Sequence, residues 1–543
     1  MASGHVRVPE PRNEPILGYG PGSPEKKVLK ARLAELRGQE MEIPLVIGGR
    51  EVRTGRLGEL RLPHRHGHLL ARFHQAGPAE VGAAVEAARS ARRDWAAASW
   101  SDRAAVFLRA AELLSGPWRA TLNGATMLGQ SKTVFQAEID AACETADFWR
   151  FNVHFGDRLQ AEQPISPPGQ WNRMEYRALE GFVLAVTPFN FTSIAANLPT
   201  APALLGNAVV WKPASTAVYS AWQIQRLLEA AGLPPGVVNF VPGPGGAVAE
   251  AALSSPALAG VHFTGSTAVF QDLWRAVAAN LPRYRSFPRL VGETGGKDFV
   301  FAHPSADPDA LAVALVRGAF EYQGQKCSAA SRAYLPESLW PAVRERLVAM
   351  MAAIRMGDVE DFTNFMGALI DRAAFEKVRR HVDRARSSPD VRIVAGGGAF
   401  PEVGWFVEPT LVETRDPHHP LMQEEIFGPV LAVFPYPDAR LEEALELCDA
   451  TSPYGLTGAV FARDREAIAR MSRALEDAAG NFYVNDKPTG AVVGQQPFGG
   501  ARKSGTNDKA GSLAHLLRWV SPRAIKENLA PPTRFEYPHM QEK

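Results

Sequence analysis

One cysteine has the surroundings of a nucleophile. Cys327 lies in YQGQKCSAASR, where a glycine precedes a predicted bend between elements and Lys326 adds a positive charge beside the thiol. A thiolate attacks carbonyl carbons, and cationic neighbours lower the pKa of a thiol, so we expect Lys326 to favour the thiolate. Most single cysteines are small buried hydrophobic residues, so catalysis is the better interpretation only if partners accompany Cys327.

Two further residues offer the chemistry that such a nucleophile needs. Glu293 in LVGETGGKD ends an apolar strand and precedes two glycines that permit close approach of backbone or ligand, where a desolvated carboxylate can act as a base. Asn190 in TPFNFT follows another strand, and its amide can donate to an oxyanion. The ordinary alternatives are a surface or capping glutamate and a turn asparagine.

A third group of residues fits a nucleotide. The stretch VHFTGSTAV, residues 261–269, predicts a strand, one glycine, hydroxyl residues and a helix, whose first N–H groups suit a pyrophosphate. Lys212 in VVWKPAS ends another strand, where an ammonium can hold ribose hydroxyls. Because the GxGxxG pattern is absent, a capped helix without ligand and a surface lysine are the alternatives.

Other motifs are excluded by their spacing. The segment from Gly124 to Gly129 is followed by Gln130 instead of lysine, and GGARKSG at residues 499–505 has the wrong glycine spacing, so neither is a P-loop. The sequence contains no HExxH and no paired CxxC. We therefore expect no catalytic metal.

The elements that must position these residues alternate between strand and helix. From Gly181 the chain reads FVLAV, a broken helical segment, AVVW, a helix over residues 215–232, VVNFV and VHF. Unbroken apolar runs are typical of strands that are covered on both faces. The pattern predicts a parallel doubly wound sheet that binds its ligand at the carboxyl ends of the strands.

A second α/β series follows Glu293, with helices over residues 309–322 and 338–355 and the runs RAYL, LAVF and GAVF, so we expect a second domain. Before these series, helices are expected over residues 26–38, 79–98 and 102–114. Residues 1–24 read as a loosely held arm. The proline-rich stretch of residues 163–181 reads as an arm that leaves the body.

Composition bounds the class of protein. The 543 residues include 59 Lys plus Arg and 58 Asp plus Glu, and a formal net charge of +1 provides no field to recruit nucleic acid or anionic lipid. Three cysteines are too few for a disulfide framework and indicate a reducing compartment. No apolar run is long enough for a transmembrane helix, so we expect neither nucleic acid nor membrane as partner. We expect a cytoplasmic protein, or a mitochondrial matrix protein in a eukaryote.

Taken in order, seven motifs resemble the aldehyde dehydrogenase superfamily: TPFNFTS, VVWKPAS, FTGST, ETGGK, GQKCSA, EEIFGPV and NDKPTGAVVGQQPFGGARKSGTNDK. The resemblance spans about residues 13–541. The longer stretches RNEPILGYGPGSPE, FQAEIDAACETADFWRFN and LRWVSPRAIKEN resemble its delta-1-pyrroline-5-carboxylate dehydrogenase branch.

The resemblance implies a role for each candidate residue. Cys327 attacks the aldehyde, Asn190 and the Cys327 N–H stabilise the oxyanion, and Glu293 activates the water that hydrolyses the thioester. It assigns NAD to Thr187, Lys212, Ser215, Gly265, Ser266, Thr267, Ala268, Val269, Lys326, Glu425 and Phe427. Ser215 stands where many NAD-specific relatives carry a glutamate that repels a 2′-phosphate, so strict exclusion of NADP is not implied.

The implied substrate is glutamate 5-semialdehyde, whose far end carries an ammonium and a carboxylate. By resemblance, Ser328 and the backbone N–H groups of Gly490 and Ala491 anchor the carboxylate, while Phe191 and Phe498 flank the aliphatic chain. Ala491 departs from relatives that carry serine there. The implied reaction is NAD-dependent oxidation to glutamate, the second step of proline catabolism.

The resemblance also implies an α/β aldehyde dehydrogenase fold with three parts. These are a Rossmann-like doubly wound NAD-binding domain over residues 25–162 and 181–292, an α/β catalytic domain over 293–506, and a small β oligomerisation arm formed by 163–180 and 507–543, all preceded by an N-terminal arm over 1–24. We expect the arm to make a homodimer. The alternatives are transfer of the thioester to coenzyme A, and a binding protein that retained the fold without activity.

Overall fold

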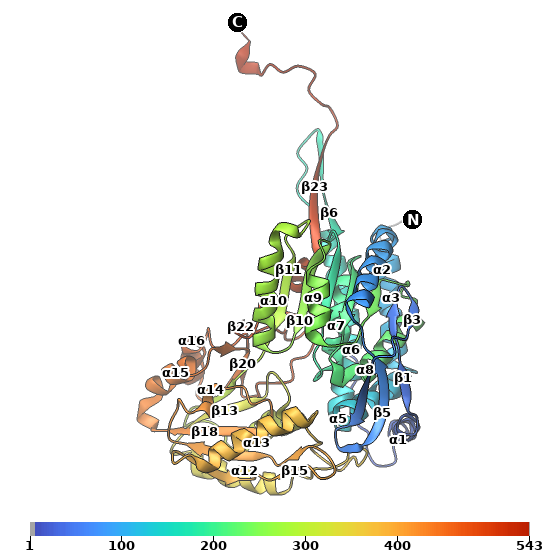
Figure 1. The fold of residues 1–543 in the computed structure, drawn as a ribbon. Coiled ribbons are helices and arrows are strands. Elements are labelled where there is room, and N and C mark those ends of the chain that lie inside the picture. Colours follow the sequence, from blue (N-terminus) through green and yellow to red (C-terminus); the bar gives the residue numbers. More distant parts are fainter. Residues whose placement is uncertain (1–5, 542–543) are drawn as a thin grey trace.

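The computed structural model describes residues 6–541, so the expectations for the first five and last two residues lie outside it. The body contains two seven-stranded sheets, one from each of the two predicted α/β series (Figure 1). The first sheet has the order β11-β10-β7-β8-β9-β2-β3. Its strands are β11 (Arg289–Glu293), β10 (Leu258–Thr264), β7 (Phe182–Val186), β8 (Ala208–Lys212), β9 (Val238–Phe240), β2 (Leu45–Ile47) and β3 (Arg50–Val52).

The predicted parallel sheet is confirmed for the five strands from β11 to β9. The β2–β3 hairpin adds an antiparallel edge that the sequence pattern did not reveal. Alternate side chains of β7 enter different cores: Val183 and Ala185 pack on one face of the sheet, and Phe182 and Leu184 on the other. Burial of both faces explains why this strand is an unbroken apolar run.

Helices cover both faces of the first sheet. One face carries α1 (Pro24–Arg37), α3 (Trp100–Ser115), α4 (Arg119–Gln130), α6 (Thr145–Ala161), α7 (Thr192–Leu204) and α8 (Val218–Ala230). The other carries α2 (Pro78–Ala97), α9 (Gly245–Leu253) and α10 (Thr267–Asn280). The helices expected at 26–38, 79–98, 102–114 and 215–232 are confirmed as α1, α2, α3 and α8, with ends shifted by a few residues.

The second sheet has the order β14-β17-β18-β13-β12-β20-β21, and only the β14–β17 pair is antiparallel. Its strands are β14 (Val391–Ala395), β17 (Thr410–Thr414), β18 (Val430–Tyr436), β13 (Ala330–Pro336), β12 (Asp298–Ala302), β20 (Thr457–Phe461) and β21 (Asn481–Val484). Helices α13 (Arg372–Ser387), α15 (Leu441–Ala450) and α16 (Arg465–Ala474) cover one face, and α11 (Pro308–Phe320) and α12 (Trp340–Ala352) the other.

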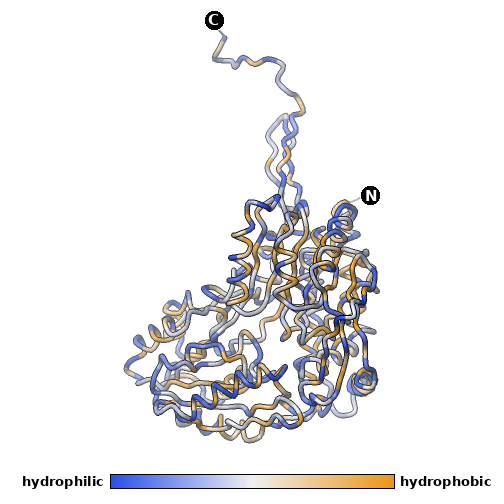
Figure 2. Tube along the Cα trace, viewed as in Figure 1, coloured by the Kyte–Doolittle hydropathy of each residue, from blue (hydrophilic) through white to orange (hydrophobic). Residues whose placement is uncertain are grey.

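An arm leaves the body. Strands β6 (Gln170–Ala178) and β23 (Val520–Asn528) pair antiparallel along nine residues, and the chain continues beyond them to its carboxyl end (Figure 1). The arm is more hydrophilic than the strands of the body (Figure 2). The expectation that residues 163–181 leave the body is confirmed up to residue 177, whereas Ala178 and Leu179 are buried in the body. A further sheet, of β1 (Met41–Ile43), β5 (Arg65–His74) and β4 (Leu57–Leu62), flanks the first domain.

Two features near the amino end differ from expectation. Within the expected loose arm, residues 13–19 are held against the body, because Tyr19 is buried and Asn13, Glu14 and Leu17 bond to helices of the body. Between α5 (Val134–Ala137) and α6 lies a π-helix, η1 (Glu138–Glu144), which the sequence pattern did not reveal. Such wide turns often occur at functional sites because they reorient side chains. No helix within residues 6–541 is long and apolar enough to cross a bilayer.

Candidate active site

The loop that carries Cys327 is held in an uncommon conformation. The loop follows the short helical turn η4 (Glu321–Gly324) and leads into β13. Within η4, Tyr322, Gln323 and Gly324 have φ values of 51°, 55° and 65°. A Cβ on Gly324 would collide with the Gly428 carbonyl oxygen. Left-handed backbone at non-glycine residues persists only where surrounding contacts enforce it, and it is frequent at active sites.

Two buried glutamine side chains supply those contacts. Gln323 Nε2 donates to the carbonyls of Ser131 (3.1 Å) and Ala368 (2.7 Å). Gln325 Oε1 accepts from the Ile370 N–H at 2.9 Å. Side chains that bridge to separate segments fix the loop before any substrate arrives.

The two glycines after Glu293 allow the close approach that their position predicted. A Cβ on Gly296 would collide with the Cys327 carbonyl oxygen, and a Cβ on Gly295 would lie 2.5 Å from the Glu425 carboxylate. A side chain at position 296 would meet backbone, so only glycine fits there, whereas at position 295 the Glu425 carboxylate would have to move. The ETGGK motif, the cysteine loop and the EEIFGP segment are thus packed directly against one another.

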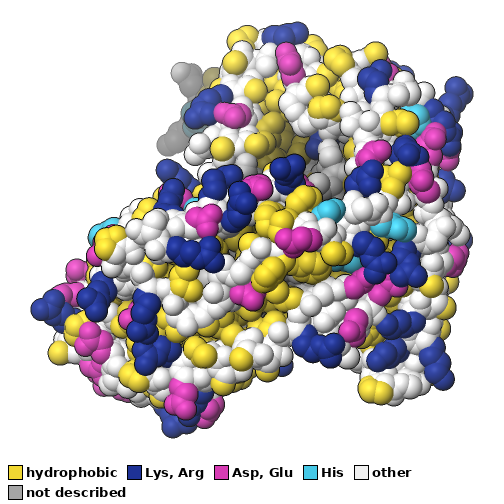
Figure 3. All heavy atoms as spheres, turned by 60° about the horizontal axis from the view of Figure 1, so that its bottom comes forward, with side chains coloured by type: hydrophobic (Ala, Val, Ile, Leu, Met, Phe, Trp, Pro, Cys, Tyr) yellow, Lys and Arg dark blue, Asp and Glu magenta, His cyan; other side chains and the backbone are white. Residues whose placement is uncertain are grey.

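A cavity of about 440 Å³ lies where these segments meet. It is lined by eight of the residues singled out from the sequence: Phe191, Glu293, Lys326, Cys327, Ser328, Gly490, Ala491 and Phe498. Asn190 is buried beside it and donates from Nδ2 to the Gln325 carbonyl at 3.1 Å. One face of the molecule is hollowed, with hydrophobic side chains in the hollow and Lys and Arg side chains near its edge (Figure 3).

The cavity favours the neutral forms of the thiol and of the base. Burial, followed by the charges of Asp298, Glu425 and Glu293, raises the pKa of the Cys327 thiol. Burial also raises the pKa of Glu293 well above its usual range, and the Gly500 N–H, 3.3 Å from Oε2, offsets only part of this shift. A carboxylate with a raised pKa is a competent proton acceptor near neutral pH.

The expected effect of Lys326 on the thiol is wrong. Its Nζ lies 3.0 Å from Glu321 Oε2 in a buried ion pair, and both residues line the cavity. The ammonium is therefore neutralised by a carboxylate from the same turn, which sequence neighbours alone could not reveal. The assignment of Lys326 to the dinucleotide stays a prediction.

One end of the cavity suits an anion. Ser328 Oγ and Thr489 Oγ1 lie 2.8 Å apart, and Gly490 has a φ of 93°. Among residues 6–541, no group accepts a hydrogen bond from the Gly490 or Ala491 N–H. A Cβ on Gly490 would lie 3.0 Å from Lys487 Nζ, so an ammonium stands beside these donors. Sequence reasoning missed Lys487 and Thr489, although both lie inside the NDKPTG motif.

Another part of the cavity wall suits a cation. Glu144, from the π-helix, lines the cavity and accepts a hydrogen bond from Ser193 Oγ at 2.9 Å. Burial and then the charge of Asp140 raise the pKa of Glu144 to about 8. A bound ammonium would favour the ionised form. Sequence reasoning missed Glu144, which ends the π-helix that the sequence pattern did not reveal.

Candidate dinucleotide residues gather at the carboxyl ends of neighbouring strands of the first sheet. Thr187 follows β7 directly and Lys212 ends β8, and the Thr187 N–H donates to the Lys212 carbonyl at 3.1 Å. Gly265 follows β10. Burial lowers the pKa of Lys212 to about 8. Ser215 begins the short turn η2 (Ser215–Ala217) before α8.

Helix α10 begins as the sequence predicted. Ser266 is its N-cap, and its Oγ accepts from the Val269 N–H at 3.4 Å. The N–H groups of Thr267 and Ala268 belong to the first turn, which has no intrahelical acceptor for them. Their direction suits an anion at the edge of the sheet.

The second domain contributes two candidates to the same region. Glu425 accepts from the Gly296 N–H at 3.0 Å, and burial raises its pKa. The ring of Phe427 meets that of Phe189 edge to face at 5.8 Å, which joins the EEIFGP segment to the TPFNF segment of the first domain. The structure thus brings residues from both predicted domains together.

Comparison with known proteins agrees with this architecture. Residues 54–525 match the aldehyde dehydrogenase family. The chain is 52% identical over 530 residues to a protein of Bos taurus, and 50% identical over 538 residues to one of Dictyostelium discoideum. Both are named mitochondrial delta-1-pyrroline-5-carboxylate dehydrogenase. These alignments cover 97% and 98% of this chain, and 94% and 96% of the relatives.

Solved structures give the same result. The crystal structure of a delta-pyrroline-5-carboxylate dehydrogenase from Mycobacterium tuberculosis bound with NAD superposes with a TM-score of 0.97 at 55% identity, over the full length of both chains. A 1-pyrroline-5-carboxylate dehydrogenase from Thermus with bound NAD gives a TM-score of 0.90 at 33% identity and covers 96% of this chain and 100% of its own. By sequence and by fold, this chain belongs to the aldehyde dehydrogenase family.

Proposed function

We propose that this chain is an L-glutamate gamma-semialdehyde dehydrogenase, which oxidises glutamate 5-semialdehyde to glutamate with NAD in the second step of proline catabolism. The observation that carries the proposal is a single cavity lined by groups for the chemical reaction, for an anion and for a cation. It holds a thiol and a carboxylate for the chemistry, Cys327 and Glu293, and polar groups for both charges of the substrate. The similarity to delta-1-pyrroline-5-carboxylate dehydrogenases along the whole chain supports the same substrate.

The residues present fit NAD. Lys212 is a desolvated ammonium at the strand ends of the first sheet, and Glu425 is a buried carboxylate of the second domain. Such groups hold ribose hydroxyls. The first turn of α10 offers N–H groups to a pyrophosphate. When bound, NAD supplies a hydride acceptor. We assign it to Thr187, Lys212, Ser215, Gly265, Ser266, Thr267, Ala268, Val269, Lys326, Glu425 and Phe427.

Each step of the reaction is assigned to particular residues of the cavity. The Cys327 sulfur, once its proton has left, adds to the aldehyde carbon and forms a thiohemiacetal, whose oxygen receives hydrogen bonds from the Asn190 amide and the Cys327 N–H. Loss of a hydride from that carbon leaves a thioester on Cys327. Glu293 takes a proton from water as the water oxygen attacks the thioester carbon. The carbon–sulfur bond breaks, the product leaves and ionises to glutamate, and the proton on Glu293 passes to the Cys327 thiolate.

The cavity fits the two charges at the far end of the substrate. We assign the carboxylate to Ser328, to the N–H groups of Gly490 and Ala491, and to Lys487. We assign the ammonium to Glu144. Phe191 and Phe498 flank the chain of methylene groups. Lys487 supplies an ionic contact where Ala491 lacks the hydroxyl of a serine.

Glu293 also favours hydrolysis over transfer to coenzyme A, because a base in the cavity serves water as the acceptor. We propose further that the β6–β23 arm pairs with a second copy and forms a homodimer. Light scattering should then give the mass of two 58.9 kDa chains. A single-chain mass would refute the dimer.

The names of these relatives include the word mitochondrial. We propose that this chain is located in the cytoplasm, or in the mitochondrial matrix if its source is a eukaryote.

One experiment tests the function. Purified protein is mixed with pyrroline-5-carboxylate and NAD, without coenzyme A, and the absorbance of NADH is followed. We expect turnover, with a far smaller kcat/KM for propanal, which lacks both charged groups. The Cys327→Ala variant should make no NADH. Turnover by this variant at the normal rate, or a requirement for coenzyme A, would refute the proposal.

A further inference from the structure

We propose that the segment from Asn13 to Tyr19 is a fixed wall of the substrate cavity, and that Asn13 is a positioning residue that sets specificity by clamping the loop over residues 490–497. This inference rests on the proposed function. Asn13, Glu14 and Ile16 line the cavity together with Val493 and other residues of that loop. This side of the cavity is therefore built from two segments whose contacting residues, Asn13 and Val493, are 480 residues apart along the chain.

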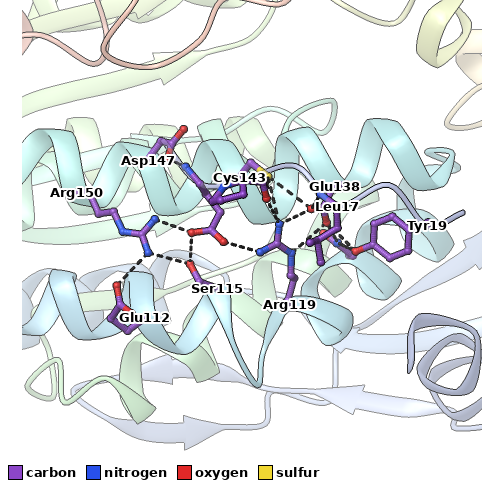
Figure 4. A network of polar contacts seen from close by, with 12 residues as sticks. Leu17, Tyr19, Glu112, Ser115, Arg119, Glu138, Cys143, Asp147 and Arg150 are labelled. Carbon is purple, nitrogen blue, oxygen red and sulfur yellow. Dashed lines mark hydrogen bonds and ion pairs between the residues drawn. The ribbon is translucent and has the colours of Figure 1, made fainter. Parts of the chain in front are cut away.

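The segment is fixed by a buried ionic network (Figure 4). Arg119 forms ion pairs with Glu138 of the π-helix and, at 2.6 Å, with Glu14. The Tyr19 hydroxyl donates to Glu138 Oε2 at 2.7 Å, and the Leu17 N–H donates to Glu138 Oε1 at 2.8 Å. Buried charges with several partners hold a single arrangement, since any displacement leaves a charge unpaired.

Asn13 connects this wall to the loop and to α6 through both N–H donors and the carbonyl acceptor of its side-chain amide. Nδ2 donates to Asp147 Oδ2 of α6 and to the Val493 carbonyl, both at 2.8 Å. Oδ1 accepts from Gln495 Nε2 at 3.0 Å. One side chain thereby joins α6, the amino-terminal segment and the loop. Both amide hydrogens and the oxygen are used, so the orientation of the group is determined by its partners.

The loop has little other support on this side. Its hydrogen bonds run mostly within itself, from the N–H groups of Gln495 and Gln496 to the Val492 carbonyl and from the Val492 N–H to Gln496 Oε1. A Cβ on Gly494 would collide with the Phe151 ring, so the loop also packs against α6. At the far end of the loop, Asn481 Nδ2 donates to the Pro497 carbonyl at 3.0 Å. Near Val493 and Gln495, the Asn13 side chain supplies the polar contacts to the amino-terminal segment.

The consequence concerns the substrate carboxylate. The proposed anchors, the Gly490 and Ala491 N–H groups, lie at the start of this loop, shortly before Val493. Preorganised donors bind tightly because no ordering is required on binding. Loss of the clamp should therefore weaken binding of the carboxylate and leave the Cys327 and Glu293 chemistry in place.

The test compares Asn13→Ala and Asn13→Asp with a matched control, Arg12→Ala. Arg12 is the neighbouring residue and its side chain is exposed. Aspartate has the size of asparagine, but it cannot donate and places a second carboxylate beside Asp147. For Asn13→Ala we expect KM for the semialdehyde to rise about tenfold with kcat changed less than about threefold, because both hydrogen bonds from the Asn13 side chain to the loop are lost. Asn13→Asp should be at least as severe.

The decisive readout is the ratio of kcat/KM for the semialdehyde to that for propanal. It should fall about tenfold in both Asn13 variants and stay unchanged in Arg12→Ala. An unchanged KM, an equal loss with both aldehydes, or the same effect in Arg12→Ala would overturn the inference.

Two measures keep the outcomes distinct. If Asn13→Ala does not fold, as judged by its thermal unfolding, Gln495→Ala decides: KM should rise and the ratio should fall, and an unchanged KM would overturn the inference. If the wild-type protein makes no NADH from pyrroline-5-carboxylate, the proposed function itself is wrong. If the wild-type protein turns over and the Asn13 variants have the same KM and the same kcat/KM ratio, only the proposed role of Asn13 is refuted.

Discussion

Replacement of Glu293 by glutamine should separate the two halves of the reaction. The amide has nearly the same shape, and its oxygen can still accept from the Gly500 N–H, which lies 3.3 Å from Oε2, so the fold should be preserved. The variant loses only the ability to take a proton from water. Thioester formation on Cys327 should proceed, whereas hydrolysis should become slow.

The size of the effect follows from the role of the carboxylate. A positioned general base contributes about 10²–10⁴-fold, which corresponds to about 3–5 kcal/mol at about 1.4 kcal/mol per factor of ten. Steady-state NADH formation should therefore fall by about that factor. Stopped-flow mixing should show a burst of about one NADH per chain before the slow phase.

The pH dependence gives a second criterion. Burial raises the pKa of Glu293, and Asp508 raises it further, so the active carboxylate form is populated only above this raised value. The wild-type rate of hydrolysis should rise with pH through that range, and the variant should lack this rise. Turnover of Glu293→Gln at the wild-type rate, or a slow first turnover without a burst, would refute the assignment.

Three other changes test the remaining parts of the cavity. Lys487→Met should raise KM for the semialdehyde about tenfold, and an unaltered KM in steady-state kinetics would remove Lys487 from the carboxylate site. Glu144→Gln should raise KM for the semialdehyde similarly. Because burial raises the pKa of Glu144 to about 8, the ionised form that binds the ammonium increases as pH rises toward that value, and wild-type KM should fall. This pH dependence of KM should be absent in the variant. Glu138→Ala removes one of the two carboxylates paired with Arg119 and the acceptor of Tyr19 and Leu17. It should lower the free energy of unfolding in urea by about 3–5 kcal/mol, whereas a loss below about 1 kcal/mol would show that the network is dispensable.

Much of the fold was predictable because its signals are local. The apolar runs FVLAV, AVVW and VHF predicted parallel strands covered on both faces, and β7, β8 and β10 confirm this. The glycines after Glu293 predicted close approach, and they meet the Cys327 carbonyl and the Glu425 carboxylate. The β2–β3 edge was missed because its strands have three residues each, too few for a periodic pattern.

The chain by itself determined which groups are chemically competent. A cysteine after a bend, and a glutamate and an asparagine after strands, in motifs of fixed order, implied the reaction and the family, since residue types and element ends are properties of short segments.

Only the tertiary structure decided which charges are neutralised and which walls enclose the cavity. It pairs Lys326 with Glu321, turns Glu144 inward through a π-helix, and places Asn13 beside Val493. These outcomes depend on contacts between residues that are remote in sequence, or on a backbone irregularity. These contacts are stabilised by burial and by hydrogen bonds between separate segments, and a local sequence pattern specifies neither of these two contributions.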